Sequence, residues 1–115
     1  MIEHIYFYDK CPPMNGIAGD TFPLFRVRVD DMDLTGCSMR VLLEPKYTPG
    51  EVVFTKSCSH YTAQSEEGFS VRLASSDTEN LLGCYTMYFV LTDSNDREYW
   101  KLKGTLEVLA RPAEV

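Results

Sequence analysis

The stretch from Gly83 to Asp93 constrains the fold more than any other part of the chain. Its side chains alternate between two faces, with Tyr85, Met87, Phe89 and Leu91 on one face and Cys84, Thr86, Tyr88, Val90 and Thr92 on the other. A period of two residues is typical of an extended strand, and aromatic and β-branched residues favour one. Since both faces are largely apolar, we expect this strand to be central in its sheet.

Shorter runs with the same alternation surround this strand and are separated by turn signals. They cover residues 5–8, 21–29, 37–43, 52–55, 60–63, 69–73 and 98–108. The only helical signal is a capping-box spacing from Ser76 to Glu79, which predicts at most one helical turn. This pattern predicts an all-β fold of two antiparallel sheets packed as a sandwich.

A glycine interrupts the last of these strands. Trp100, Leu102, Leu106 and Val108 share the parity of Gly104. Glycine inside a strand is typical of a bulge or a bend, because it has no side chain to pack there. We therefore expect a bulge at Gly104 and structural roles for both Gly104 and Trp100.

Length and composition bound the class of protein. A chain of 115 residues, 44% hydrophobic and 24% charged, fits one globular domain, 1–115, with residues 1–18 as an N-terminal strand or arm plus a loop. A net charge of -6 without a basic stretch argues against nucleic acid and anionic membranes as partners. The N-terminus has no basic and apolar leader, and we expect synthesis in a cytoplasm.

Candidate chemical sites are incomplete in the sequence. Asp31, Asp33 and Thr35 match the opening of a calcium loop, but Leu42 stands at the position of the bidentate glutamate. Cys58 and His60 are too few for zinc, and as a nucleophile pair they lack a third orienting group. We therefore expect no catalytic, cofactor or metal-binding residues, and a protein that is not an enzyme.

The four cysteines are dispersed along the chain, at Cys11, Cys37, Cys58 and Cys84. Because no export signal or paired spacing accompanies them, we expect four reduced thiols without a catalytic role.

The tyrosines support an alternative, a carbohydrate- or surface-binding module. Aromatic faces stack on sugars, and five tyrosines lie where exposure is expected: Tyr6, Tyr8, Tyr47, Tyr61 and Tyr99.

Residues 82–87, with the sequence Leu-Gly-Cys-Tyr-Thr-Met, resemble the tyrosine-corner stretch of immunoglobulin-like sandwiches. In those domains a tyrosine near the start of a core strand returns its hydroxyl to the upstream backbone. The resemblance implies this role for Tyr85, with Gly83 just before it, and a buried hydroxyl bonded near the 75–80 connector. Met87 stands where immunoglobulin domains have a cysteine, so no inter-sheet disulfide is expected.

A longer series of motifs runs from residue 19 to residue 108. In order, they are Gly19-Asp20-Thr21-Phe22, Asp33-Leu34-Thr35-Gly36, the strand from Gly68 to Leu73, Thr78-x-x-Leu81-x-Gly83-x-Tyr85, Asp93 in a hairpin, and Gly104-x-Leu106-x-Val108. This order resembles the small β-sandwich domains of tailed-phage structural proteins, such as the N-terminal domain of baseplate upper proteins. The resemblance implies an immunoglobulin-like antiparallel β-sandwich of about seven or eight short strands.

From the resemblance we expect a non-enzymatic structural component of a phage or prophage tail or baseplate. It would act through contacts with other proteins of that assembly or with itself, and would reach the virion after cytoplasmic synthesis. The apolar run Ile5, Tyr6, Phe7 and Tyr8 is either an arm that pairs with a neighbouring chain or the first strand of the sandwich itself.

Overall fold

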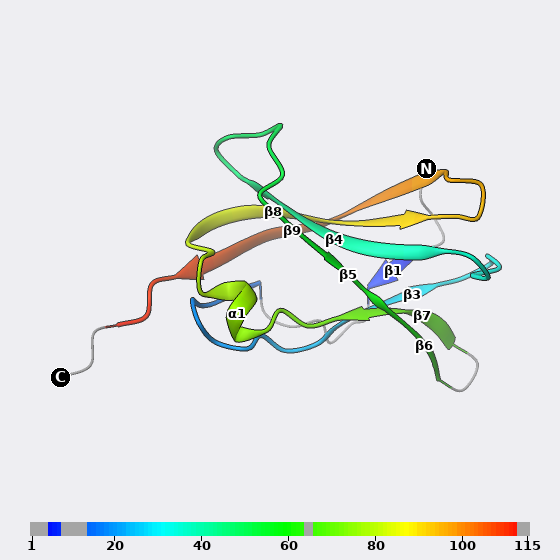
Figure 1. The fold of residues 1–115 in the computed structure, drawn as a ribbon, viewed down its shortest axis with the longest axis horizontal. Coiled ribbons are helices and arrows are strands. Elements are labelled where there is room, and N and C mark those ends of the chain that lie inside the picture. The colour runs from blue at the N-terminus through cyan, green and yellow to red at the C-terminus, as the bar shows by residue number, and fades with distance from the viewer. Residues whose placement is uncertain (1–4, 8–13, 64–65, 113–115) are drawn as a thin grey trace.

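The computed structural model describes residues 5–7, 14–63 and 66–112, which form an all-β fold of two facing sheets (Figure 1). The elements are β1 (Ile5–Phe7), β2 (Asn15–Ile17), β3 (Phe25–Val29), β4 (Ser38–Pro45), β5 (Phe54–Ser57), β6 (Ser59–Ala63), β7 (Glu66–Val71), α1 (Ser75–Thr78), β8 (Gly83–Thr92) and β9 (Glu98–Leu109). The expected two-sheet, sandwich-like architecture is thus confirmed. No helix of the described residues has the length and apolar character needed to cross a membrane.

The two sheets differ in size and in strand direction. One has four strands in the order β1-β3-β7-β6, and the other has five in the order β2-β9-β8-β4-β5. Neighbours run antiparallel except β2 and β9, which are parallel. The sequence predicted antiparallel pairing throughout and seven or eight strands. Both expectations are wrong, because β2 pairs in parallel with β9 and the described residues form nine strands.

The extra strand β2 occupies residues that the sequence indicated as a loop. The turn signal Asn15-Gly16 is overridden because the backbone on both sides of it bonds to β9: Glu107 donates to the Met14 carbonyl, and Ala18 donates to the Leu109 carbonyl. Glycine is needed at position 16 because of a close packing contact, not because the chain turns there. A Cβ at this position would lie 2.5 Å from the Phe22 ring, so only glycine lets that ring pack here.

Strand β8 is central in the five-stranded sheet, between β9 and β4, as the alternation predicted. Its inward face, Tyr85, Met87, Phe89 and Leu91, is buried. The Phe89 ring lies 5.3 Å from the Phe7 ring and 6.3 Å from the Phe25 ring, so β8 joins both sheets into one core.

The bulge expected at Gly104 is present. Gly104 has φ +144°, and the register between β8 and β9 shifts at Met87 and Tyr88, so that Lys103 is the additional residue. Because of the shift, even-numbered side chains of β9 point to solvent before the bulge and into the core after it. Leu106 and Val108 are buried, whereas Trp100 and Leu102 point outward and are 43% and 58% exposed.

The N-terminal run forms a strand of the sandwich itself. Ile5 to Phe7 pair with β3, and Ile5 is buried in the core. The alternative of the chain's own first strand therefore describes β1, while Tyr8 lies outside the described residues.

Candidate functional site

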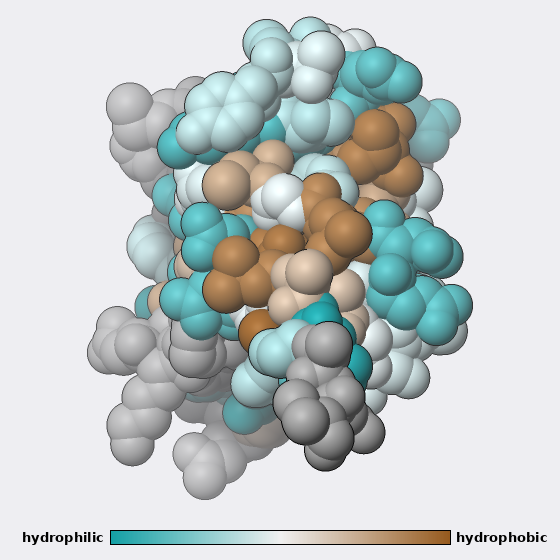
Figure 2. Space-filling view, turned by 90° about the vertical axis from the view of Figure 1, so that its left-hand side faces the viewer, coloured by the Kyte–Doolittle hydropathy of each residue, from teal (hydrophilic) through white to brown (hydrophobic). Residues whose placement is uncertain are grey.

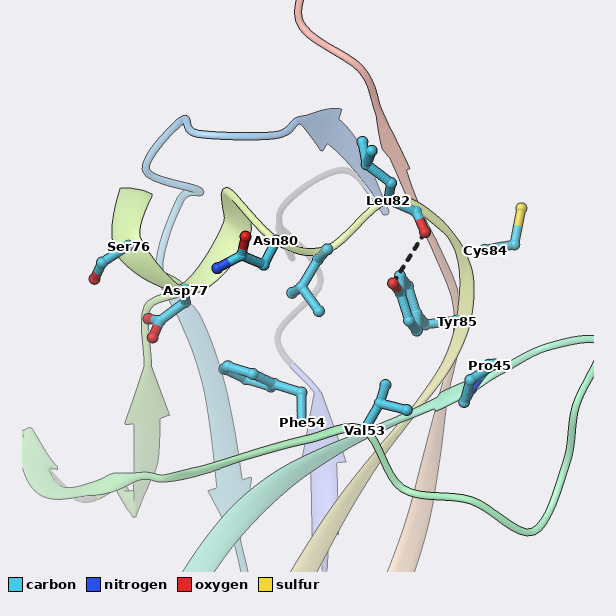
Figure 3. A pocket seen from close by; sticks show the side chains of 10 residues that line it. Pro45, Val53, Phe54, Ser76, Asp77, Asn80, Leu82, Cys84 and Tyr85 are labelled. Carbon is cyan, nitrogen blue, oxygen red and sulfur yellow. Dashed lines mark hydrogen bonds between the residues drawn. The ribbon is translucent and has the colours of Figure 1, made fainter.

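A hollow of about 590 Å³ opens at one end of the sandwich, between the α1–β8 segment and the β4–β5 segment. Leu81 and Tyr85 are buried on its α1–β8 side, and Pro45, Val53 and Phe54 line it from the other side. Figure 3 shows Val53, Phe54 and Tyr85 around this space, with the Cys84 side chain directed away from it. We call this feature the α1 hollow.

Lys56 connects the walls at the side of this hollow. Its side chain reaches from β5 to the segment that joins β7 to β8, where Nζ donates to Asp77 Oδ2 in α1 at 2.5 Å and to the Arg72 carbonyl at 2.9 Å. Asp77 Oδ2 also accepts from the Ala74 amide at 2.8 Å. Burial alone raises the pKa of Asp77, but the hydrogen bonds from Lys56 and Ala74 outweigh it and hold the pKa below its ordinary value.

These contacts also correct the predicted helix start. Ala74, not Ser76, is the N-cap, and Asp77, not Glu79, returns its side chain to the N-cap amide. The helical turn therefore begins one residue after Ala74, and the carboxylate that closes its first turn is the one that Lys56 also binds.

Thr78 fixes α1 to the rest of the fold and was not recognised from the sequence. It is fully buried. Its hydroxyl donates to the Asp20 carbonyl at 2.7 Å and accepts from the Gly19 amide at 3.0 Å. A single hydroxyl thus links α1 to a loop far away in the sequence, since Gly19 and Asp20 precede Thr78 by 59 and 58 residues. A threonine in a short polar connector carries no signal of such a role.

Tyr85 is buried, and its hydroxyl donates to the Leu82 carbonyl at 3.0 Å (Figure 3). The acceptor is backbone, as expected, two residues beyond the predicted 75–80 connector. Gly83, between donor and acceptor, has φ +113°, a conformation that side chains rarely adopt. The bond therefore depends on glycine at this position.

Exposed apolar side chains lie in and next to the lining of the hollow. Val53 and Leu82 line it and are 48% and 57% exposed, and Val52, which precedes Val53 in the chain, is 50% exposed. Figure 2 shows hydrophobic side chains gathered in the middle of this end of the molecule, with hydrophilic side chains on both sides. The valines were predicted to begin a strand, but β5 starts only at Phe54 and leaves them in the preceding loop. We call these three residues the apolar rim.

The other candidate groups have structural partners. Asp33 accepts from the Thr35 amide, and Asp93 accepts from the Asn95 and Arg97 amides, which lowers the pKa of both carboxyls. These are turn geometries rather than ligand sets. Within the described ranges, no group of three or more His, Cys, Asp or Glu side chains could hold a metal ion.

The thiols at Cys37, Cys58 and Cys84 are free, while Cys11 lies outside the described residues. Burial raises the pKa of the Cys58 thiol to about 12, which makes it a poor nucleophile. His60 is exposed and bonds to Glu67 Oε1 at 3.0 Å. The hydrogen-bond partner of the His60 ring is thus Glu67, on the neighbouring strand β7.

The tyrosines do not form one platform. Tyr47 is 79% exposed, whereas Tyr61 and Tyr99 are partly buried, and Tyr8 is outside the described residues. Cationic groups lie over three of the rings: Arg28 over Tyr6 at 5.1 Å, Lys46 over Tyr47 at 5.7 Å and Arg26 over Tyr61 at 4.4 Å.

Comparison with known proteins finds no family model, no curated protein and no solved structure that matches the chain. The surfaces described above therefore carry the functional inference.

Proposed function

We propose that this protein is a non-enzymatic structural component that acts through protein–protein contacts, with the apolar rim of the α1 hollow as its main contact surface. The supporting observation is the combination of an open hollow with two half-exposed aliphatic side chains in its lining, Val53 and Leu82. Exposed apolar side chains grouped beside a concavity are typical of protein interaction sites. A bulky apolar side chain of a neighbouring protein fits such a surface.

Three of the four edge strands among the described residues, β1, β2 and β5, favour contacts through side chains over contacts through added strands, whereas β6 is a five-residue edge. Among the described residues, β1 and β2 are edge strands of three residues each. The edge strand β5 directs Lys56 inward, and Lys103 of β9 reaches inward to the Phe7 ring at 5.0 Å. Short edge strands and inward charges are devices that prevent strand addition. Because Ile5 to Phe7 pair with β3 of the same chain, an arm that pairs with a neighbour is not part of this proposal.

The assembly we propose is a phage or prophage tail or baseplate, with an immunoglobulin-like sandwich as the specific fold. The order of sequence motifs from Gly19 to Val108 supports both, together with the tyrosine-corner hydrogen bond of Tyr85. In this role the protein is made in the bacterial cytoplasm and is carried in the virion.

The test combines genetics with particle analysis. We expect the gene to lie in a phage-like cluster and the protein to be present in induced particles by mass spectrometry. Leu82→Glu should prevent incorporation, because it places a charge in the apolar rim, while Leu24→Glu, at a residue 40% exposed outside the rim, should leave it intact. A gene outside any such cluster, with particles that lack the protein, would show that the proposal is wrong.

A carbohydrate-binding module is the second candidate, and the exposure of Tyr47 is the observation that favours it. The cations over three tyrosine rings, which lie on β1, β6 and the loop after β4, count against it because they occupy the faces on which a sugar would stack. Binding on a glycan array that is lost in Tyr47→Ala would favour this candidate over the first.

A further inference from the structure

The most exposed large hydrophobic side chain of the described residues lies next to the α1 hollow. Tyr47 is 79% exposed and occupies the middle of the turn that follows β4. The same loop contributes to the wall of the hollow, because Pro45 at its start and Val53 at its end both line it. A projecting aromatic side chain and a concave apolar surface therefore lie side by side at one end of the molecule.

Hydrogen bonds hold the backbone around Tyr47 in place. The Lys46 amide donates to the Cys84 carbonyl at 3.0 Å, which attaches the turn to β8. The Thr48 amide donates to the Pro45 carbonyl at 3.2 Å, which closes the turn. A tyrosine that an ordered turn presents to solvent loses little conformational freedom when a partner covers it. Tyr47 is therefore preorganised for a contact.

We propose that Tyr47 of one copy of this chain enters the α1 hollow of a second copy, and that Tyr47 of the second copy enters the hollow of the first. A projection and a recess that lie side by side are complementary to the same surface turned by a two-fold axis, which is the geometry of an isologous dimer. The inference rests on the proposed function, because it identifies the neighbour that fills the hollow as a second copy.

The lining of the hollow suits a tyrosine side chain. Val53 and Phe54 provide apolar surface for the ring on one side, and Asn80 provides an amide for the phenolic hydroxyl on the α1 side (Figure 3). The hollow measures about 590 Å³, and clefts of this size hold ligands larger than one aromatic ring. A tyrosine therefore fits in both size and chemistry.

Charge favours the same pairing. Lys46 is exposed and its Nζ lies 5.7 Å from the Tyr47 ring, so a positive charge accompanies the ring into the contact. On the α1 side, Asp77 lines the hollow and Glu79 is exposed at the end of the helical turn. Asp77 already bonds to Lys56, so Glu79 is the carboxylate that Lys46 of the second copy meets. Opposite charges thus face each other, although the chain has a net charge of -6.

The area of the contact is sufficient for a dimer. A tyrosine side chain buries about 200 Å² and covers a similar area of the hollow, so two reciprocal insertions bury about 800 Å² in total. The apolar rim, which is about half exposed, is covered at the same time in both copies. The sum exceeds the ~1,000 Å² that a specific interface needs, and it predicts a Kd of roughly 10–100 µM.

The experiment is sedimentation of the purified chain from about 5 µM to about 1 mM, over which monomers should give way to dimers. Tyr47→Ala should weaken association at least about tenfold, because it removes the ring that fills the hollow, whereas Tyr47→Phe keeps the ring and should retain most of the association. Leu82→Glu should weaken it by a similar factor, because a carboxylate would be desolvated at the contact. Leu102→Glu is the matched control: Leu102 is 58% exposed and Leu82 is 57% exposed, but Leu102 does not line the hollow.

A mixture of two variants tests the reciprocal geometry. Tyr47→Ala keeps an intact hollow, and Leu82→Glu keeps an intact Tyr47. One complete insertion is possible between these two variants, but none is possible within either of them. An equimolar mixture should therefore associate more tightly than either variant alone.

Circular dichroism and thermal unfolding verify that the variants fold. A wild-type chain that is monomeric at 1 mM, about ten times the weaker end of the expected Kd, overturns the inference. So does a dimer that persists in Tyr47→Ala, a mixture that associates no more tightly than its components, or a monomer whose glycan binding is lost in Tyr47→Ala. In all these cases the particle experiment with Leu82→Glu still decides the proposed function. A chain that dimerises through Tyr47 but is absent from particles would contradict the proposed function alone.

Discussion

Replacing Thr78 by valine should destabilise the fold by about 2–3 kcal/mol, although the two side chains have nearly the same shape. From a fully buried position the hydroxyl accepts from the Gly19 amide and donates to the Asp20 carbonyl, with the Ser75 carbonyl at 3.3 Å as a second, longer acceptor. Valine leaves no cavity, so the loss is confined to these bonds. The Gly19 amide loses its acceptor in a partly buried site, which costs about 1–3 kcal/mol, and the carbonyl of exposed Asp20 recovers part of its loss through water.

The assay is urea unfolding followed by Trp100 fluorescence. With an m-value of about 2 kcal/mol/M, the midpoint should fall by about 1–1.5 M. Thr78→Ser is the control because it keeps the hydroxyl and removes one methyl group, for a cost of about 1 kcal/mol. Hydrogen exchange adds a local readout: the Gly19 amide should lose protection in Thr78→Val and keep it in Thr78→Ser. A valine variant that is as stable as the serine variant, with Gly19 still protected, would refute the reasoning.

Three further results are expected. Tyr85→Phe should lower the free energy of unfolding by about 1 kcal/mol, since water can reach the Leu82 carbonyl once the hydroxyl is gone; a change within error would show that the bond is not stabilising. With a pKa of about 12 in place of 9.0, Cys58 has a thiolate fraction at pH 8 that is roughly 1,000-fold lower than that of an ordinary cysteine. Mass spectrometry should therefore find Cys58 unlabelled by a thiol reagent in the folded protein. After denaturation without reductant, all four thiols should be labelled. The pKa of Asp77 is lowered in the folded state, so its contribution is complete above its ordinary value of 3.8 and is lost as the pH falls through the lower folded value; Asp77→Asn should flatten the acid side of the stability profile, and an unchanged profile would contradict this.

Local alternation was enough to predict the strands that form the core. In β8, period two, aromatic content and apolar faces all indicate the same state, and the structure agrees residue by residue. The bulge at Gly104 was also predictable, because a glycine inside a strand weakens regular pairing and often accompanies a bulge or a bend. The consequence of this bulge for Trp100 and Leu102 was not predictable, since the direction of a register shift is set by the partner strand, which the sequence does not identify.

The α1 hollow could not be predicted for a related reason. Its walls come from residues 45–54 and 76–85, which the pairing of β4 with β8 and the position of α1 bring together. The exposure of the two valines in the apolar rim could not be predicted, because two adjacent valines favour a strand whether or not one forms. Tyr85 is the exception among the site residues: its hydrogen bond reaches only three residues back, so a local motif was sufficient to indicate it.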